Sequence, residues 1–324
     1  MRGDVVRAAR VHDRSASGVG RTPVPTPRGR ATIVHVTFPV GVITLIGITV
    51  VWGTTFVVVK GSLETIPVPL LLALRFSLAA ACFAFVRFDR RALVPALWLG
   101  LLAFAGFATQ TLGLSITTAS RSAFITGFAV VLTPLVAAVW FRQRIAPRVY
   151  LASVVALAGL ALLTLRGGQA QGVNAGDLWT LLTALSYALY IVYLGQVAGR
   201  ANVASLAGMQ HLPMAVLAWL WAAPQLGELA HVPLGTYLAI AYLALIATAL
   251  VAWLQTYAQR VVPAPVAAII FVLEPVFASL FAWWLVGEVL GPVGWVGGAL
   301  VIVAMLIAEL RVRRRGRRVT SGPG

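Results

Sequence analysis

Apolar runs of about twenty residues without a charge recur along most of the chain, and each has the length that a helix needs to cross a hydrocarbon core of about 30 Å. Charged residues make up only 10% of the chain and hydrophobic residues 60%, whereas a soluble domain has about a quarter charged residues. Membrane strands alternate apolar and polar residues, and these runs are apolar at both alternating positions. The pattern therefore predicts an all-α integral membrane protein.

Ten membrane-spanning segments are expected, joined by short connectors that contain proline and glycine. They are Phe38–Val59, Pro67–Val86, Val94–Ser115, Ala119–Phe141, Val149–Leu165, Gly176–Gln196, Ala204–Ala223, Pro233–Ala258, Pro263–Val286 and Pro292–Leu310. Residues 1–36 are polar and arginine-rich, which predicts a disordered basic tail, with a misassigned start as the alternative. Residues 311–324 form a second basic tail.

The distribution of arginine and lysine predicts the orientation. With the N-terminus inside the cell and ten spans, 21 of the 25 basic residues fall on inside segments. The opposite orientation would invert this bias, so we expect both termini in the cytoplasm and the spans in the plasma or inner membrane. The net charge of +16 flanks the spans and does not line one folded face. Its expected partners are anionic lipids, and nucleic acid is excluded.

A weak internal repeat divides the chain. Gln110-Thr111 recurs as Gln255-Thr256, 145 residues later. Two halves of five spans each, 38–166 and 176–310, must lie in opposite orientations because five is odd. Inverted repeats of this kind are typical of secondary transporters, whose substrate site lies near the midplane between the halves. Chance similarity between two apolar stretches is the alternative.

Two charged residues lie in the middle of spans. An acid such as Glu274 costs about 2.5–3.5 kcal/mol at that depth, so it requires a partner, a water-filled cavity or a proton. It is the candidate coupling residue, with a structural hydrogen-bonding role as the alternative. Arg75 stays charged when buried. Its counter-charge is either Glu274 or a substrate carboxylate, unless its side chain extends to the membrane interface.

Further cavity candidates are amides and aromatic residues within apolar runs. They are Gln110, Gln210, Gln255, Trp52, Trp253, Tyr187 and Tyr190. Each has a purely structural alternative, namely hydrogen bonding between helices or packing. Enzyme motifs and a nucleotide-binding loop are absent from the sequence, and we expect no metal and no cofactor.

Several segments resemble the EamA-type transporters of the drug/metabolite transporter superfamily. They are Val51–Lys60 (VWGTTFVVVK), Gln110–Ser120 (QTLGLSITTAS), Gly176–Tyr193 (GDLWTLLTALSYALYIVY) and Leu273–Glu288 (LEPVFASLFAWWLVGE). The resemblance implies ten helices in two inverted five-helix EamA repeats around a central cavity. In one departure, Arg142-Gln143-Arg144 stands where the second repeat has Gly287-Glu288.

The predicted function is secondary transport, without ATP, of small metabolites such as amino acids or related polar or amphiphilic compounds. The resemblance implies an exporter that is either proton-linked or uncoupled. Because enzyme motifs are missing, we expect a non-enzymatic protein, and we expect it to act as a monomer or homodimer. A membrane-embedded lipid-handling protein, either flippase-like or lipid-modifying, is the alternative. A lateral opening and a fixed acid–base pair would favour that alternative.

Overall fold

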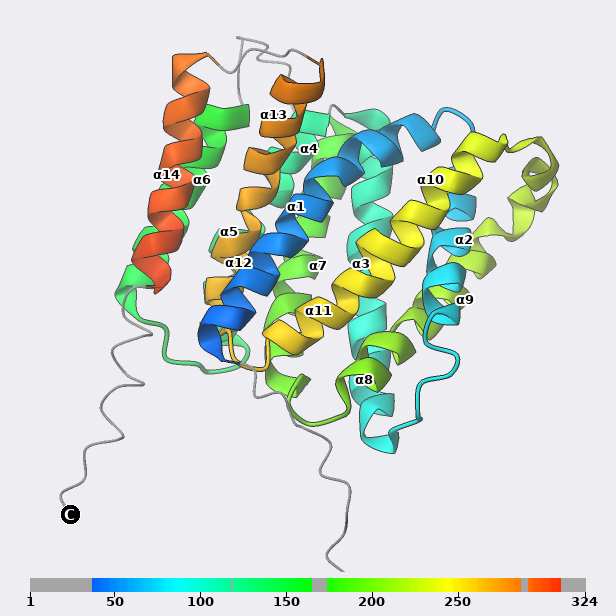
Figure 1. Ribbon diagram of the computed structural model, residues 1–324, viewed down its shortest axis with the longest axis horizontal. Helices are drawn as coiled ribbons and strands as arrows, with labels where there is room; N and C mark the ends of the chain where they lie inside the picture. Colours follow the sequence, from blue (N-terminus) through cyan, green and yellow to red (C-terminus); the bar gives the residue numbers. More distant parts are fainter. Residues whose placement is uncertain (1–36, 118, 165–173, 287–290, 310–324) are drawn as a thin grey trace, which may run out of the picture. The chain divides into compact units, whose positions relative to one another are not determined.

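A computed structural model describes residues 37–117, 119–164, 174–286 and 291–309, and every regular element within these ranges is helical (Figure 1). The first half contains α1 (Phe38–Ser62), α2 (Val68–Ala81), η1 (Arg90–Ala92), α3 (Leu93–Ile116), α4 (Ala119–Thr126), α5 (Ala129–Val139) and α6 (Pro147–Thr164). The second half contains α7 (Ala175–Val197), α8 (Val203–Met209), α9 (His211–Ala222), η2 (Ala223–His231), α10 (Leu234–Ala244), η3 (Leu245–Leu250), α11 (Val251–Ala258), α12 (Ala264–Phe271), α13 (Leu273–Val286) and α14 (Pro292–Glu309). The two predicted basic tails lie outside the described residues.

Six helical segments of the described chain are long and apolar enough to cross a membrane. These are Phe38–Ser62, Arg90–Ile116, Ser122–Val139, Ala175–Val197, Val203–His231 and Leu234–Ala258. Four further apolar helices are shorter, namely Val68–Ala81, Pro147–Leu162, Ala264–Phe277 and Pro292–Ala308. The membrane character and the helical class are therefore confirmed, and the count of ten spans stays a prediction.

Four of the segments expected as continuous spans depart from a regular α-helix. A short break divides α4 from α5, α8 from α9 and α12 from α13, and η3 joins α10 to α11. Two of the interruptions have the same cause. A proline ring clashes with the carbonyl four residues earlier. Pro213 follows Met209, the last residue of α8, by four positions, and Pro275 follows Phe271, the last residue of α12, by four. Each proline therefore ends the preceding helix where it would otherwise continue.

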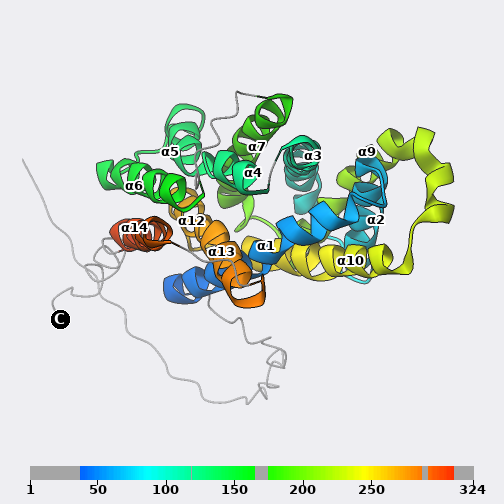
Figure 2. The same cartoon turned by 90° about the horizontal axis from the view of Figure 1, so that it is seen from above.

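The helices of the two halves pack against each other. Helix α6 lies along α14, α3 along α7, and α2 along α9 (Figures 1 and 2). The first helix of each half makes equivalent contacts with the other half. Helix α1 contacts α11 and α13, and α7 contacts α3 and α5. The α6–α14 contact is close because it lacks side chains at its centre. A Cβ on Gly159 would lie 2.7 Å from the carbonyl oxygen of Gly297.

The buried core consists of aliphatic and small side chains, while many large apolar side chains point outward. Helix α2 contributes several large side chains to this core, with Leu70, Leu71, Leu72 and Phe76 fully buried. Such an apolar exterior would be unusual on a soluble protein, but it is what lipid requires. The polar residues gathered at the centre therefore need a separate explanation.

Candidate central cavity

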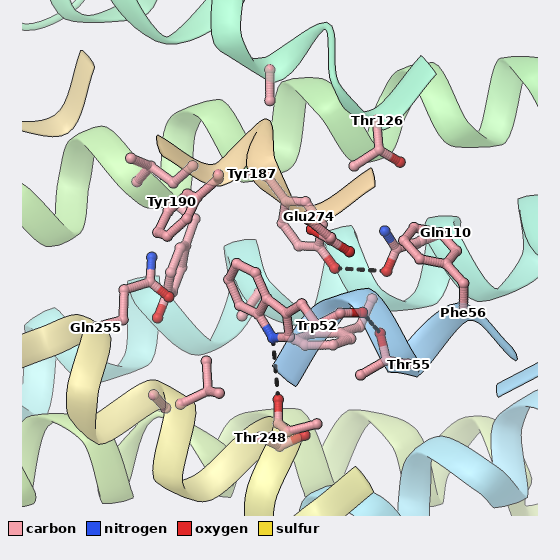
Figure 3. A pocket seen from close by; sticks show the side chains of 18 of the residues that line it. Trp52, Thr55, Phe56, Gln110, Thr126, Tyr187, Tyr190, Thr248, Gln255 and Glu274 are labelled. Atoms are coloured by element: carbon pink, nitrogen blue, oxygen red, sulfur yellow. Dashed lines mark hydrogen bonds between the residues drawn. The ribbon is translucent and has the colours of Figure 1, made fainter. Parts of the chain in front are cut away.

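A central cavity lies between the two halves. Its empty volume is about 1290 Å³ when the part that is open to solvent is included. Both halves contribute to its lining. The first half contributes residues of α1, α2, α3, α4 and α5, and the second half contributes residues of α7, α9, η3, α11, α12 and α13. Eight of the nine residues predicted from the sequence line it, and most of them are labelled in Figure 3. They are Trp52, Arg75, Gln110, Tyr187, Tyr190, Gln210, Gln255 and Glu274.

All four helix interruptions open onto this cavity. Its lining includes Thr126 beside the α4–α5 break, Gln210 at the α8–α9 break, Thr248 in η3 and Val272 at the α12–α13 break. An interrupted helix leaves backbone polar groups outside the regular hydrogen-bond ladder. Within a membrane such groups are tolerated only where they are buried in protein or face water. The breaks therefore place polar backbone around one central space.

Arg75 is buried on α2, with 3% of its surface exposed, and it lines the cavity. Its Nε donates a hydrogen bond of 2.7 Å to the hydroxyl oxygen of Thr248. The guanidinium carbon lies 4.7 Å from the centre of the Phe107 ring, which is a cation–π contact. No ion pair joins Arg75 to Glu274 in the described part of the chain. The alternative of a structural pair between these two residues is therefore wrong for this conformation.

Glu274 lies in the first turn of α13, directly before Pro275. Its half-buried side chain faces the cavity beside Tyr187 (Figure 3). An N-terminal first turn favours a negative charge because the free amide groups point toward it. In the described part of the chain, its carboxyl group makes no hydrogen bond with another residue. The acid is thus open to water or a ligand and is not locked into a structural network.

Aromatic side chains line the cavity beside the two charged residues. Tyr187 on α7 donates a hydrogen bond of 3.2 Å to the side-chain oxygen of Gln110 on α3. Its ring centre lies 5.9 Å from that of Phe107 in an edge-on arrangement. Gly106 of α3 lies directly against the face of Tyr187, where a side chain would overlap the ring. Helices α3 and α7 thereby hold the tyrosine hydroxyl at the cavity surface.

The other amide groups are engaged within the protein. Gln210 accepts a hydrogen bond of 3.0 Å from the Tyr190 hydroxyl. Gln255 donates to the side-chain oxygen of Gln259 at 3.0 Å, and Gln259 donates to the carbonyl of Ile191 at 2.9 Å. These bonds join α7 to α11 and to the α8–α9 break. They match the structural alternative for the glutamines, although both predicted residues also line the cavity.

Trp52 and Trp253 differ in placement. Trp52 lines the cavity, and its ring centre lies 5.2 Å from that of Phe271. Trp253 does not line the cavity, because it is 38% exposed and stacks on Tyr257. On α11 the inward face includes Val251 and Gln255, and each residue turns the helix by about 100°, which directs Trp253 outward. The expectation that it lines an aromatic pocket is therefore wrong.

Some cavity residues carry no strong sequence signal. Thr126 and Thr248 line the cavity, but threonine is common in membrane helices as a residue bonded to its own backbone. His211 also lines it, and its Nδ1 is buried without a hydrogen-bond partner. Its ring stacks on Phe83. No group of three histidine, cysteine or acidic side chains in the described ranges is placed to hold a metal ion.

Known proteins share this sequence pattern and fold. A protein of Archaeoglobus fulgidus named an uncharacterized transporter is 29% identical over 82% of this chain and 84% of its own length. A protein of Streptantibioticus cattleyicolor named a probable terminal-alkyne amino-acid exporter is 28% identical over 64% of this chain and 69% of its own. A solved crystal structure superposes with a TM-score of 0.68 at 17% identity, covering 85% of this chain and 98% of that one, which shows a shared fold.

The model of the EamA-like transporter family matches residues 39–165 and again residues 174–309. The two matches together cover most of the chain and both halves of the helical bundle described above. The protein therefore belongs to the EamA-like transporter family, and it is a multi-pass membrane transporter.

Proposed function

We propose that this transporter is a secondary exporter of small amphiphilic metabolites that carry a carboxylate, with amino acids as the leading class. The observation that carries the proposal is a central cavity with an arginine and a glutamate that are not paired with each other. A charged group in a membrane interior is expensive unless it has a function or a partner. The two residues are therefore the expected contacts for a ligand with separated charges.

Arg75 is the expected site for the carboxylate. Its Nε donates a hydrogen bond to the Thr248 hydroxyl. A guanidinium presents its donors in a fixed planar arrangement that matches a carboxylate through two parallel hydrogen bonds. Phe107 and Tyr187 beside it offer apolar surface for the side chain of the same ligand. The lipid-handling alternative calls for a fixed acid–base pair, and Arg75 and Glu274 are not paired with each other, so that alternative has less support.

Glu274 is the expected site for proton coupling or for the ammonium group of an amino acid. It faces the cavity from the first turn of a helix that begins at a break. A carboxyl group at such a position can bind a proton from one side of the membrane and release it on the other when the protein changes conformation. Proton binding there would supply a driving force that does not require a nucleotide.

The proposed architecture is ten spans in two inverted repeats, 38–166 and 176–310, in the plasma or inner membrane with both termini in the cytoplasm. The exchange-symmetric packing of α1 with α11 and α13, and of α7 with α3 and α5, supports it. So do the four interrupted helices, because discontinuous helices at the repeat interface are typical of secondary transporters. Rocking of the two halves would then expose the cavity to each side in turn.

The first experiment compares metabolites in the medium of cells that express the wild type, Glu274→Gln, or an empty vector. Glu228→Gln makes the same chemical change at an exposed residue of η2 and serves as the matched control. We expect an amino-acid-like compound to accumulate with the wild type and with Glu228→Gln. It should not accumulate with Glu274→Gln, although that variant should be present in the membrane at the same level.

Purified protein in liposomes then tests the substrate class directly, with propargylglycine, a terminal-alkyne amino acid, as the first probe. Leucine and phenylalanine follow as probes with the same charged groups. Transport that responds to an imposed pH gradient in the wild type and not in Glu274→Gln supports coupling. Full pH-dependent transport by Glu274→Gln excludes the coupling role, and no transport of any carboxylate compound excludes the substrate class.

A further inference from the structure

The span that contains α10 and α11 has a π-helical turn at its centre. Residues Leu245–Leu250 adopt this wider turn. The amide of Val251 donates to the carbonyl of Ile246, five residues earlier, where a regular α-helix would use Ala247. The Thr248 hydroxyl likewise donates to the carbonyl of Leu243, five residues earlier, at 2.7 Å. Isolated π turns are rare within α-helices and occur frequently at functional sites.

The carbonyl displaced by this turn has a partner in the other half of the molecule. Trp52 of α1 donates its indole N–H to the carbonyl oxygen of Ala247 at 3.3 Å. Figure 3 shows the indole reaching from α1 toward this turn. A carbonyl left without a partner in a membrane interior costs free energy. The bond from Trp52 therefore stabilises the π turn relative to a regular helix.

The turn presents one side chain to Arg75. The hydroxyl hydrogen of Thr248 is directed to the Leu243 carbonyl, so its oxygen accepts the 2.7 Å bond from the Arg75 Nε. Phe107 contacts the face of the same guanidinium. One edge and one face of the planar group are thus set by the protein. The two terminal amino groups lie on the opposite edge, and Arg75 lines the cavity.

We propose that Thr248 is a positioning residue. Its bond to Nε aims the terminal N–H groups of Arg75 into the cavity, where they bind the carboxylate of the transported molecule. The π turn that Trp52 stabilises places Thr248 at this point. The proposal rests on the proposed function, in which Arg75 binds that carboxylate. A regular helix would turn Thr248 relative to α11 by about 100°, because a π turn contains one extra residue. Arg75 would then lose its Nε acceptor.

The same span offers a matched control. Thr256 is buried, lies in α11, and donates its hydroxyl hydrogen to the Ala252 carbonyl at 2.7 Å, in the ordinary α-helical pattern. It does not line the cavity. Thr256→Val and Thr248→Val therefore remove the same group from the same membrane span, and only Thr248→Val removes an acceptor from Arg75. Thr248→Ser keeps the hydroxyl and should keep the function.

The experiment measures transport into liposomes of propargylglycine, leucine and phenylalanine by the wild type and by each variant. We expect Thr248→Val to raise KM about 10-fold or more, because a hydrogen bond to a charged group contributes a free energy of at least that size. The maximal rate should change much less. Thr248→Ser and Thr256→Val should stay near the wild-type KM. Trp52→Phe, which removes the indole N–H together with part of the ring system, should raise KM in the same direction by a smaller factor, because the Ala247 carbonyl loses its donor.

The outcomes separate this inference from the proposed function. Arg75→Gln should abolish saturable transport. If it does so while Thr248→Val keeps the wild-type KM, the positioning role is wrong and the carboxylate site stands. If Arg75→Gln transports normally, the carboxylate site itself is wrong. If Thr256→Val and Thr248→Val raise KM equally, the effect reflects general packing of the helix and the positioning role is again excluded.

Discussion

Gly106→Ala should disturb the cavity through a single methyl group. Gly106 is buried on α3, and the ring of Tyr187 on α7 covers it. A Cβ at this position would lie 2.6 Å from Cδ1 of Tyr187, whereas ordinary contacts begin at 3.4 Å. The ring must therefore move by about 1 Å, because carbon atoms repel steeply at shorter separations. The expected direction of movement is toward the cavity, since α3 lies behind the ring.

Two opposing terms set the size of the effect on stability. Forcing an additional methyl into a packed interior typically costs about 1–3 kcal/mol. Replacing a helical glycine with alanine returns about 1 kcal/mol through helix propensity. The net loss of unfolding free energy is therefore about 0–2 kcal/mol. Displacing Tyr187 also strains its 3.2 Å bond to Gln110, which is worth about 1 kcal/mol.

The assay combines thermal unfolding in detergent with transport of propargylglycine in liposomes. Gly106→Ala should lower the melting temperature slightly and reduce transport about fivefold, because the loss of about 1 kcal/mol at the cavity surface corresponds to a factor of about five. Gly47→Ala is the matched control, since that exposed helical glycine has no atom within 4 Å of the position of its Cβ. The control should be neutral or slightly stabilising.

A double-mutant cycle decides whether Tyr187 transmits the effect. In a Tyr187→Ala background the additional methyl has no ring to displace, so Gly106→Ala should have almost no further cost. An unchanged penalty in that background would refute the reasoning, because the damage would then come from elsewhere on α3. Equal effects of Gly106→Ala and Gly47→Ala would refute it as well.

Two further predictions concern residues away from the substrate. Trp253→Ala should leave transport unchanged because that side chain lies outside the cavity, and a loss comparable with that of Trp52→Ala would contradict the assigned orientation of α11. Asp89, between α2 and α3, accepts hydrogen bonds from the amides of Asn202 and Arg91, which lower the pKa of its carboxyl below the usual range. The contact should therefore persist at neutral pH and be lost only as the pH falls through that lowered pKa. Asp89→Ala should speed hydrogen exchange at the Asn202 amide at neutral pH. Equal exchange rates in the wild type and the variant would exclude the contact.

Charged residues inside spans were identifiable from the sequence for a physical reason. Arg75 and Glu274 are so costly in lipid that their position alone indicates a cavity or a partner. Each lines the same central cavity in the structure. Their relation to each other was not predictable, because the acceptor of Arg75 is Thr248, which is 173 residues away in the sequence.

The direction in which an apolar helix faces was the least predictable feature. Trp52 and Trp253 occur in similar apolar runs, yet only Trp52 lines the cavity. A soluble helix reveals its buried face through alternation with polar residues. A span surrounded by lipid on one side and by apolar helices on the other is apolar on both faces, so its sequence does not contain that signal.

The sequence by itself determined the helical class, the membrane environment, the location of most spans and the polar residues that lipid cannot accommodate, because these follow from hydropathy and chain length. Tertiary structure alone decided that four helix interruptions converge on one cavity, that η3 is a π turn and that Trp52 bonds to the carbonyl of Ala247. Those features depend on contacts between α1 and η3, far apart in the chain. A hydrogen bond across 195 residues has no local pattern, since its energy arises only after both helices have packed.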